Sequence, residues 1–140
     1  MTARRLCTFT VDDVVLGIEI DHVVEILRDG VVTPVPLAAP SVAGLLNLRG
    51  QIITAIDARR RFDRRPSDGV PVHVVIRSGG EAVSLLVDRE GEVLDVDESM
   101  AIAPPTVDPA LRSFTTSAYL VDGDTVLVLD PEKTLTVASN

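Results

Sequence analysis

The chain has 140 residues and a formal net charge of −8, and its apolar fraction of 46% includes only four aromatic residues and no tryptophan. This length predicts one domain whose core consists of valine, leucine and isoleucine, and the negative charge argues against a nucleic-acid binder held by phosphate contacts. The single cysteine, Cys7, cannot form an internal disulfide, and neither a membrane-spanning run nor a signal-peptide core is present. We therefore expect a cytoplasmic protein that does not insert into a membrane.

Alternating apolar and polar residues recur along the whole chain, as is typical of β-strands. Turn signals such as Asp29-Gly30 and Gly79-Gly80 separate the apolar runs. The predicted strands cover residues 6–11, 14–20, 25–27, 45–48, 51–56, 72–76, 82–87, 93–96, 114–121 and 125–129. Strands joined by long helices are absent from this pattern, so the sequence favours an all-β fold of small barrels or a sandwich over a doubly wound α/β fold.

Short helices and irregular segments are predicted between these strands. Aspartate at a helix N-terminus accepts backbone N–H bonds, so Asp57 predicts a helix over residues 58–62, and Asp130 predicts another that starts at Pro131. Asp21 predicts a helical turn over residues 22–24, Glu90-Gly91 predicts a turn, and Gly17 is a candidate β-bulge. The proline-containing segments 34–40 and 100–109 are expected to cross the molecule without regular structure.

Two stretches of the chain share one plan. Gly50 and Gly123 each follow a strand, and Asp57 and Asp130 lie seven residues later, where each closes the next strand and caps a helix. This repeat favours two similar half-barrels. The alternative is a chance match, because a hairpin that leads into a capped helix is a common arrangement.

The segment Asn47-Leu48-Arg49-Gly50 between two apolar strands is the main candidate for a functional site. With its apolar flanks, and with Gly17-Ile18-Glu19-Ile20, Val23, Glu25-Ile26 and Ile56-Asp57, it resembles the CheW family of chemotaxis coupling proteins. Val87-Asp88, Val93-Leu94 and Leu129-Asp130 also fit the family pattern. The resemblance extends over nearly the whole chain, and we expect a single CheW-like domain over residues 6–136.

This resemblance implies a fold and a function. The fold is all-β, with two SH3-like five-stranded β-barrels packed around a hydrophobic core and short helices, including a C-terminal one. The function is that of a non-enzymatic adaptor, without a cofactor or metal, that couples transmembrane chemoreceptors to a CheA-type histidine kinase. One face of the first barrel is expected to pack on the kinase regulatory domain, and the groove between the barrels is expected to take the helical tip of the receptor.

The resemblance also implies partner-binding residues, which are Val23, Glu25, Asn47, Arg49, Gly50 and Val72. A hydrophobic groove with an arginine at its edge is suited to docking an amphipathic helix. Val72 is expected on the groove wall opposite Val23. The simpler interpretations stay open: Arg49 as a solvated turn residue, and the two valines as plain core. The chain departs from the family pattern at Thr54, Ala58, His22 and His73, and the two histidines are expected at the surface or groove edge.

Other functions have weaker support in the sequence. A CheW-like adaptor in a pathway other than motility fits the same residues. From another class, the basic run Arg59, Arg60, Arg61, Arg64 and Arg65 would suit a small-barrel nucleic-acid or ligand binder, although it is interleaved with only one aromatic residue, Phe62. No phosphate-binding glycine loop, metal-ligand spacing or nucleophile motif indicates an enzyme.

Overall fold

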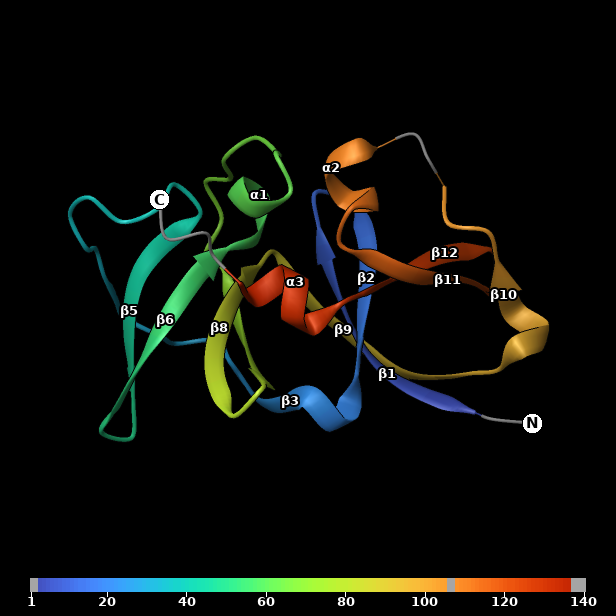
Figure 1. The fold of residues 1–140 in the computed structure, drawn as a ribbon, viewed down its shortest axis with the longest axis horizontal. Coiled ribbons are helices and arrows are strands. Elements are labelled where there is room, and N and C mark those ends of the chain that lie inside the picture. Colours follow the sequence, from blue (N-terminus) through green and yellow to red (C-terminus); the bar gives the residue numbers. More distant parts are fainter. Residues whose placement is uncertain (1–2, 106–107, 137–140) are drawn as a thin grey trace.

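The computed structural model describes residues 3–105 and 108–136, which form two curled β-sheets, each of six strands (Figure 1). Barrel A consists, in spatial order, of β10 (Ala101–Ile102), β11 (Thr115–Val121), β12 (Asp124–Leu129), β2 (Val14–Glu19), β1 (Arg4–Val11) and β9 (Arg89–Val96). Barrel B consists of β4 (Val32–Thr33), β5 (Val42–Leu48), β6 (Gln51–Asp57), β8 (Glu81–Val87), β7 (Val72–Ser78) and β3 (Val23–Leu27). Each barrel thus has five longer strands and a two-residue edge strand, and the predicted two-barrel, all-β fold is confirmed.

The two barrels repeat one strand order and one register. Leu46 faces Ile53 in the β5–β6 hairpin, and Tyr119 faces Val126 at the corresponding place in the β11–β12 hairpin. Parallel pairing joins β6 to β8 and, equivalently, β12 to β2. The repeat expected from the sequence is therefore present. However, the barrels are interleaved along the chain, because β1 and β2 join β9 to β12, whereas β3 to β6 join β7 and β8.

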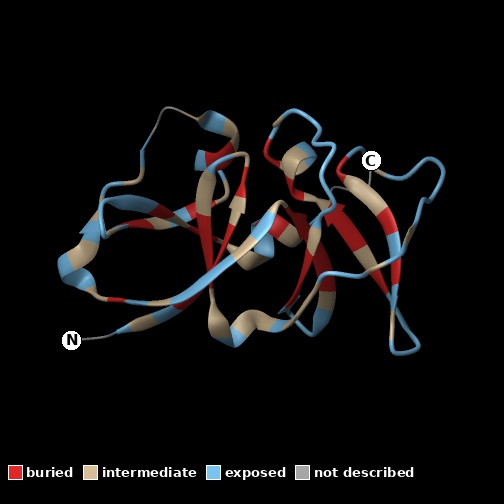
Figure 2. Cartoon of the chain, turned by 180° about the vertical axis from the view of Figure 1, so that it is seen from behind, coloured by how far each residue is buried: buried red, intermediate tan, exposed pale blue. Residues whose placement is uncertain are grey.

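The largest hydrophobic core lies between the two sheets. Phe9 and Ile18 reach it from barrel A, Ile56 and Leu85 reach it from barrel B, and Phe62 packs into it directly after the first helix. Smaller apolar clusters fill each barrel. Buried residues accordingly follow the strands that face the middle of the molecule, while loops and hairpin tips are exposed (Figure 2).

The described residues include three short α-helices: α1 (Ala58–Arg61) and α2 (Pro109–Arg112) each lie between strands, and α3 (Pro131–Leu135) follows the last strand. The two predicted caps are confirmed: the Asp57 carboxylate accepts the N–H groups of Arg59 and Arg60, and Asp130 accepts that of Lys133. Helix α2 is not predicted from the sequence; it begins at Pro109, the last residue of a segment expected to be irregular. It is capped in the same way, because Asp108 accepts the N–H of Leu111 at 3.2 Å.

The turn predicted at Glu90-Gly91 is wrong, because both residues lie inside β9. The register between β1 and β9 shifts there, opposite residues 7–9. A Cβ atom on Gly91 would lie 2.4 Å from Oγ1 of Thr8, so glycine serves close strand approach rather than chain reversal. The bulge proposed at Gly17 is also wrong, since Gly17 pairs regularly with Thr8.

The helical turn near Asp21 is displaced from its predicted position. A 3₁₀ turn covers Ile20–His22, Asp21 lies inside it, and no side chain caps it. Strand β3 then begins at Val23, two residues earlier than predicted. A second 3₁₀ turn, Glu98–Met100, leads into β10, so two further short elements occupy a region without clear periodicity.

Candidate functional site

The Asn47 to Gly50 segment forms the tip of the β5–β6 hairpin. Arg49 and Gly50 have φ values of 51° and 85°, as a two-residue type I′ turn requires, and this turn matches the twist of the paired strands. The Gly50 N–H donates to Oδ1 of Asn47 at 2.9 Å, which closes the turn. Asparagine and glycine therefore shape the tip that presents Arg49.

Arg49 pairs with Glu25 through two parallel contacts. Its Nη1 lies 2.6 Å from Oε1 of Glu25, and its Nη2 donates to Oε2 at 2.7 Å. Glu25 lies on β3, one edge of the barrel B sheet, so the pair connects the hairpin tip to that edge. The Glu25 side chain is 20% exposed and that of Arg49 is 72% exposed. The carboxylate thus orients a guanidinium that stays accessible from solvent.

The two valines of the predicted set are half-buried in one sheet. Val23 lies on β3 opposite Ile76 of β7, and Val72 lies at the start of β7. Both pack against the core between the barrels. The expected position of Val72 on an opposite groove wall is wrong, because β3 and β7 are neighbouring strands. The structure therefore brings Glu25, Asn47, Arg49 and Gly50 together, while Val72 lies apart from them.

Two exposed apolar side chains accompany the hairpin tip and are missing from the predicted set. Leu45 faces Thr54 and Ile52 faces Asn47 across the β5–β6 ladder, so all four side chains share one face of the hairpin. Leu45 is 37% exposed and Ile52 is 56% exposed. The sequence gives only a weak indication of this exposed apolar face. Both faces of the strand pair carry apolar residues, and because only one face can fill the barrel, the other must be exposed.

His73 is buried, so its predicted place at the surface or groove edge is wrong. Its Nδ1 lies 3.1 Å from Oγ of the buried Ser84, and Gly30 packs closely against the imidazole ring. Burial lowers the pKa of His73 below its ordinary value, and a hydrogen bond with the Gly30 backbone opposes that shift. His22 is half-buried, and its Nδ1 lies 3.1 Å from the carbonyl oxygen of Arg77.

The basic run after β6 does not form a free cationic patch. Arg59 pairs with Asp88, Arg64 pairs with Asp12 and Asp108, and Arg61 donates to backbone carbonyls of α3. Nucleic-acid phosphates would have to displace these partners. Three of the five arginines in this run are therefore engaged by other parts of the chain, which lowers the charge available to a nucleic acid.

The described part of the chain has few other side chains that could bind a metal or react as a nucleophile. Residues 3–105 and 108–136 contain no group of three or more His, Cys, Asp or Glu side chains that could hold a metal ion. Cys7 is 4% exposed, and burial raises the pKa of its thiol. None of the described helices is long and apolar enough to cross a membrane.

The fold and this surface site define a two-barrel protein whose polar groups are presented at a hairpin tip. The chain belongs to the CheW-like domain family, whose model matches residues 5–139. This family consists of chemotaxis scaffold proteins rather than enzymes, in agreement with the adaptor class expected from the sequence.

Individual relatives support the same assignment. A chemotaxis protein CheW from Rhizobium meliloti is 28% identical over 130 residues, covering 91% of this chain and 84% of the relative. Another from Thermotoga maritima is 26% identical over 133 residues, covering 92% and 85%. The crystal structure of the scaffolding protein TtCheW from Thermoanaerobacter tengcongensis superposes with a TM-score of 0.88 at 23% identity, covering 99% of this chain and 97% of that one. That last likeness concerns the fold.

Proposed function

We propose that this chain couples the cytoplasmic tips of chemoreceptors to a CheA-type histidine kinase. The observation that carries the proposal is the Arg49–Glu25 pair at the tip of a hairpin that also exposes Leu45 and Ile52. Binding sites between proteins commonly combine an exposed apolar anchor with an oriented arginine. Family membership provides the class of partner, and the hairpin provides a surface of suitable chemistry.

Arg49 is suited to bind a partner because it is held in place before binding. Two contacts with Glu25 restrict its rotamers, so less side-chain entropy is lost when a partner docks. The planar guanidinium has five N–H donors, so some remain for a partner after Glu25 is satisfied. Arg49, with Asn47 and Gly50 shaping its turn, is therefore the proposed centre of the contact.

The hairpin face next to Arg49 is proposed to pack on the regulatory domain of the kinase. Leu45 and Ile52 are its apolar residues. A partner domain that covers them would remove apolar area from water, which is the main favourable term in association. Val23 and Glu25 on β3, together with Val72, are the proposed receptor-binding residues, and the proposed location is the cytoplasm.

Substitutions at Arg49 test this proposal. Arg49→Ala and Arg49→Glu should each weaken binding to the kinase regulatory domain or the receptor signalling fragment of the same organism by about tenfold or more. Calorimetric titration gives the dissociation constants. The free energy of unfolding should change by less than about 1 kcal/mol, since the pair is largely exposed on its arginine side.

Arg5→Ala is the matched control, because Arg5 forms an exposed pair with Asp95 on barrel A at 2.9 Å. It removes the same kind of interaction without touching the hairpin, so binding should be unchanged. An equal loss of affinity in Arg5→Ala, or a wild-type chain that binds neither partner, would refute the proposed coupling role.

A further inference from the structure

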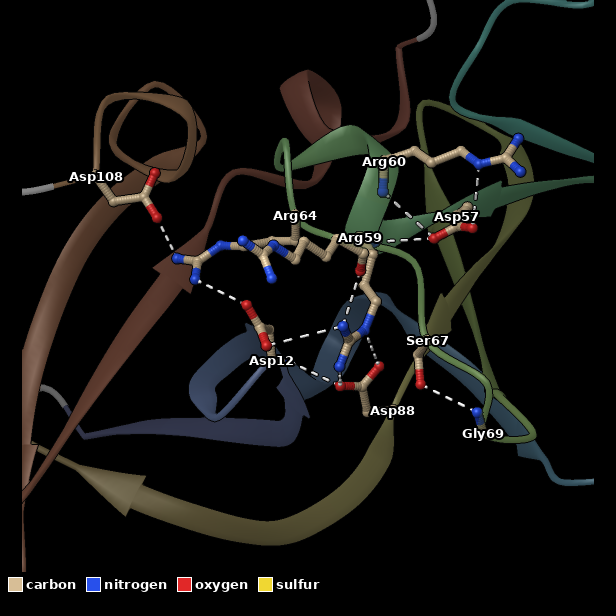
Figure 3. Close-up of polar contacts among 10 residues, drawn as sticks. Asp12, Asp57, Arg59, Arg60, Arg64, Ser67, Gly69, Asp88 and Asp108 are labelled. Atoms are coloured by element: carbon tan, nitrogen blue, oxygen red, sulfur yellow. Dashed lines mark hydrogen bonds and ion pairs between the residues drawn. The ribbon is translucent and has the colours of Figure 1, made fainter.

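The junction between the barrels contains a network of arginines that start from α1. This four-residue helix follows β6 of barrel B. Arg59 and Arg64 extend from it and from the loop behind it toward aspartates on three other segments, whereas Arg60 points to the other side of the helix, beside Asp57 (Figure 3). Sequence reasoning treats this run as one basic surface, but its members have different partners.

Arg59 binds Asp88, the residue at which the chain passes from one barrel to the other. Its Nε and Nη2 donate to the two carboxylate oxygens of Asp88 at 2.9 and 2.6 Å. Asp88 lies between β8 of barrel B and β9 of barrel A, and its Oδ2 also accepts the N–H of Asp12, at the β1–β2 turn, at 2.7 Å. The Arg59 side chain is only 16% exposed, and its hydrogen bonds lower the pKa of Asp88. This is a preorganised two-pronged contact.

Arg64 and Arg61 add further contacts from the same segment. Arg64 donates to Oδ2 of Asp12 at 3.2 Å and also pairs with Asp108, the residue that caps α2. Arg61 donates to the carbonyl oxygen of Lys133 at 2.8 Å, and its guanidinium carbon lies 4.7 Å from the centre of the Phe114 ring. One short segment of barrel B is thereby attached to the turns and helices of barrel A.

The internal repeat shows that this network is present on only one of two equivalent sides. By register, Glu132 of α3 occupies the position of Arg59, Asp21 that of Asp88, and Gly79 that of Asp12. No arginine and aspartate can pair there. Glu132 instead lines an open pocket of about 440 Å³ with Gly79 and other residues. The barrels are thus joined by a charge network along one edge. Outside this network, Arg28, directly after β3, pairs with Glu90 of β9, but the Arg28 side chain is 74% exposed. Apolar packing, which is not directional, supplies the rest of the contact.

We propose that Arg59 and Arg64 are positioning residues that fix the angle between the barrels and thereby the position of the proposed receptor-binding residues of β3 relative to barrel A. Helix α1 lies at one edge of the molecule, and β3, with Val23 and Glu25, lies at the opposite edge (Figure 1). A change in the angle at the fastened edge moves the barrels relative to each other at the far edge. This inference rests on the proposed function, because it assigns Val23 and Glu25 of β3 to a receptor.

Distance measurements between the barrels test the inference. Gln51 and Asp124 are exposed and begin the second strand of equivalent hairpins, so Gln51→Cys and Asp124→Cys allow one spin label on each barrel, while Cys7 is buried. In the full chain, Arg59→Gln and Arg64→Gln should broaden the distance distribution from pulsed electron resonance about twofold. The same variants, without labels, should bind the receptor signalling fragment about tenfold more weakly, because the proposed receptor-binding residues are less preorganised.

Conservative and control variants separate positioning from general damage. Arg59→Lys keeps the charge but not the two-pronged contact, so its distance distribution and affinity should lie between those of the wild type and Arg59→Gln. Arg60→Gln, on the same helix, should change neither. If Arg59→Gln fails to fold by circular dichroism, Arg64→Gln decides the question, because its side chain is more exposed at 22%.

The outcomes distinguish this inference from the proposed function. An unchanged distance distribution in folded Arg59→Gln and Arg64→Gln would overturn the inference, and so would a broadened distribution with undiminished receptor affinity. If the wild-type chain does not bind the receptor fragment, the proposed function fails, whereas the distance measurement still tells whether these arginines fix the barrels.

Discussion

Barrel A and barrel B have the same strand order and the same hairpin register, yet they differ at a few equivalent positions. Leu6 fills the interior of barrel A where His73 fills that of barrel B. Ser117 follows the register shift in β11 where Gly44 follows the one in β5. The shared positions are those that any barrel of this kind requires, and the differences mark what each barrel does separately.

The hairpin tips give the clearest difference. Arg49 and Asp122 start equivalent turns, and their φ values are 51° and 50°. Arg49 pairs with Glu25, whereas Asp122 lines one pocket together with Glu92, the equivalent of Glu25. The backbone therefore accepts either charge at this position, and an arginine at residue 49 is not a requirement of the turn.

The largest expected loss of stability comes from placing in barrel B, at the register shift, the serine that barrel A has at the equivalent position. Gly44 has a φ of 152°, and a Cβ atom on it would lie 2.1 Å from the carbonyl oxygen of Thr33. Gly44→Ser should lower the free energy of unfolding by about 3 kcal/mol, since strain and overpacking add. Urea unfolding followed by far-UV circular dichroism measures the change.

Gly79→Ser is the matched control, because Gly79 has a φ of 62° but no neighbouring atom within 4 Å of a Cβ. It should cost about 1 kcal/mol, from backbone strain alone. Tyr119, the only tyrosine, is buried in barrel A and should report the same unfolding midpoint as circular dichroism for Gly44→Ser in barrel B. Separate midpoints would contradict the prediction that residues 6–136 form one domain.

Much of the fold could be predicted from local chemistry. The Gly79-Gly80 turn and the aspartate caps depend on residues only a few positions apart, so their signals are readable in the sequence. The turn predicted at Glu90-Gly91 is wrong because the requirement for glycine there is not local: it comes from contact with Thr8 on another strand. Helix α2 has the same Asp-Pro start as α3, but no periodic strand precedes it to mark where a helix should begin.

The site was less predictable because its contacts join distant parts of the chain. The Asn47 to Gly50 turn is local, whereas the Arg49–Glu25 pair forms only once β3 and the β5–β6 hairpin belong to one curled sheet. From the sequence, His73 is expected at the surface, but it is buried, and its partner there is the hydroxyl of Ser84 on the neighbouring strand β8. The arginines of residues 59–65 form one basic run in sequence and separate contacts in space.

The next effect concerns the histidine inside barrel B. Burial holds the pKa of His73 below about 6.5, its ordinary value, so the unfolded chain binds a proton at a higher pH than the folded chain does. The contribution of His73 to the free energy of unfolding is therefore fully present above about pH 6.5. It is lost as the pH falls below that value, by up to about 1.4 kcal/mol per pH unit. The double variant His73→Leu with Ser84→Ala should flatten this dependence between pH 5 and 7, as measured by urea unfolding.

Both residues are changed together because His73→Leu alone would leave the buried Ser84 hydroxyl without a partner, at a cost of about 1–3 kcal/mol. Leucine is the residue that barrel A uses at this position. His22→Gln is the control for a histidine outside the barrel interior and should retain the slope. A slope that survives in the double variant would show that another group titrates in this range.

The smallest effect is expected at the tip of barrel A. Asp122→Arg would place a guanidinium opposite Glu92, as Arg49 lies opposite Glu25, and the backbone angles at residue 49 show that arginine accepts this conformation. We expect the free energy of unfolding to rise by less than about 1 kcal/mol, and the gain should shrink in high salt, as for other exposed pairs. Asp68→Arg, in an exposed loop, changes the net charge equally and serves as the control. A gain of equal size in both variants would mean that the overall charge, rather than the Glu92 contact, stabilises the chain, and the equivalence of the two tips would then not extend to their electrostatics.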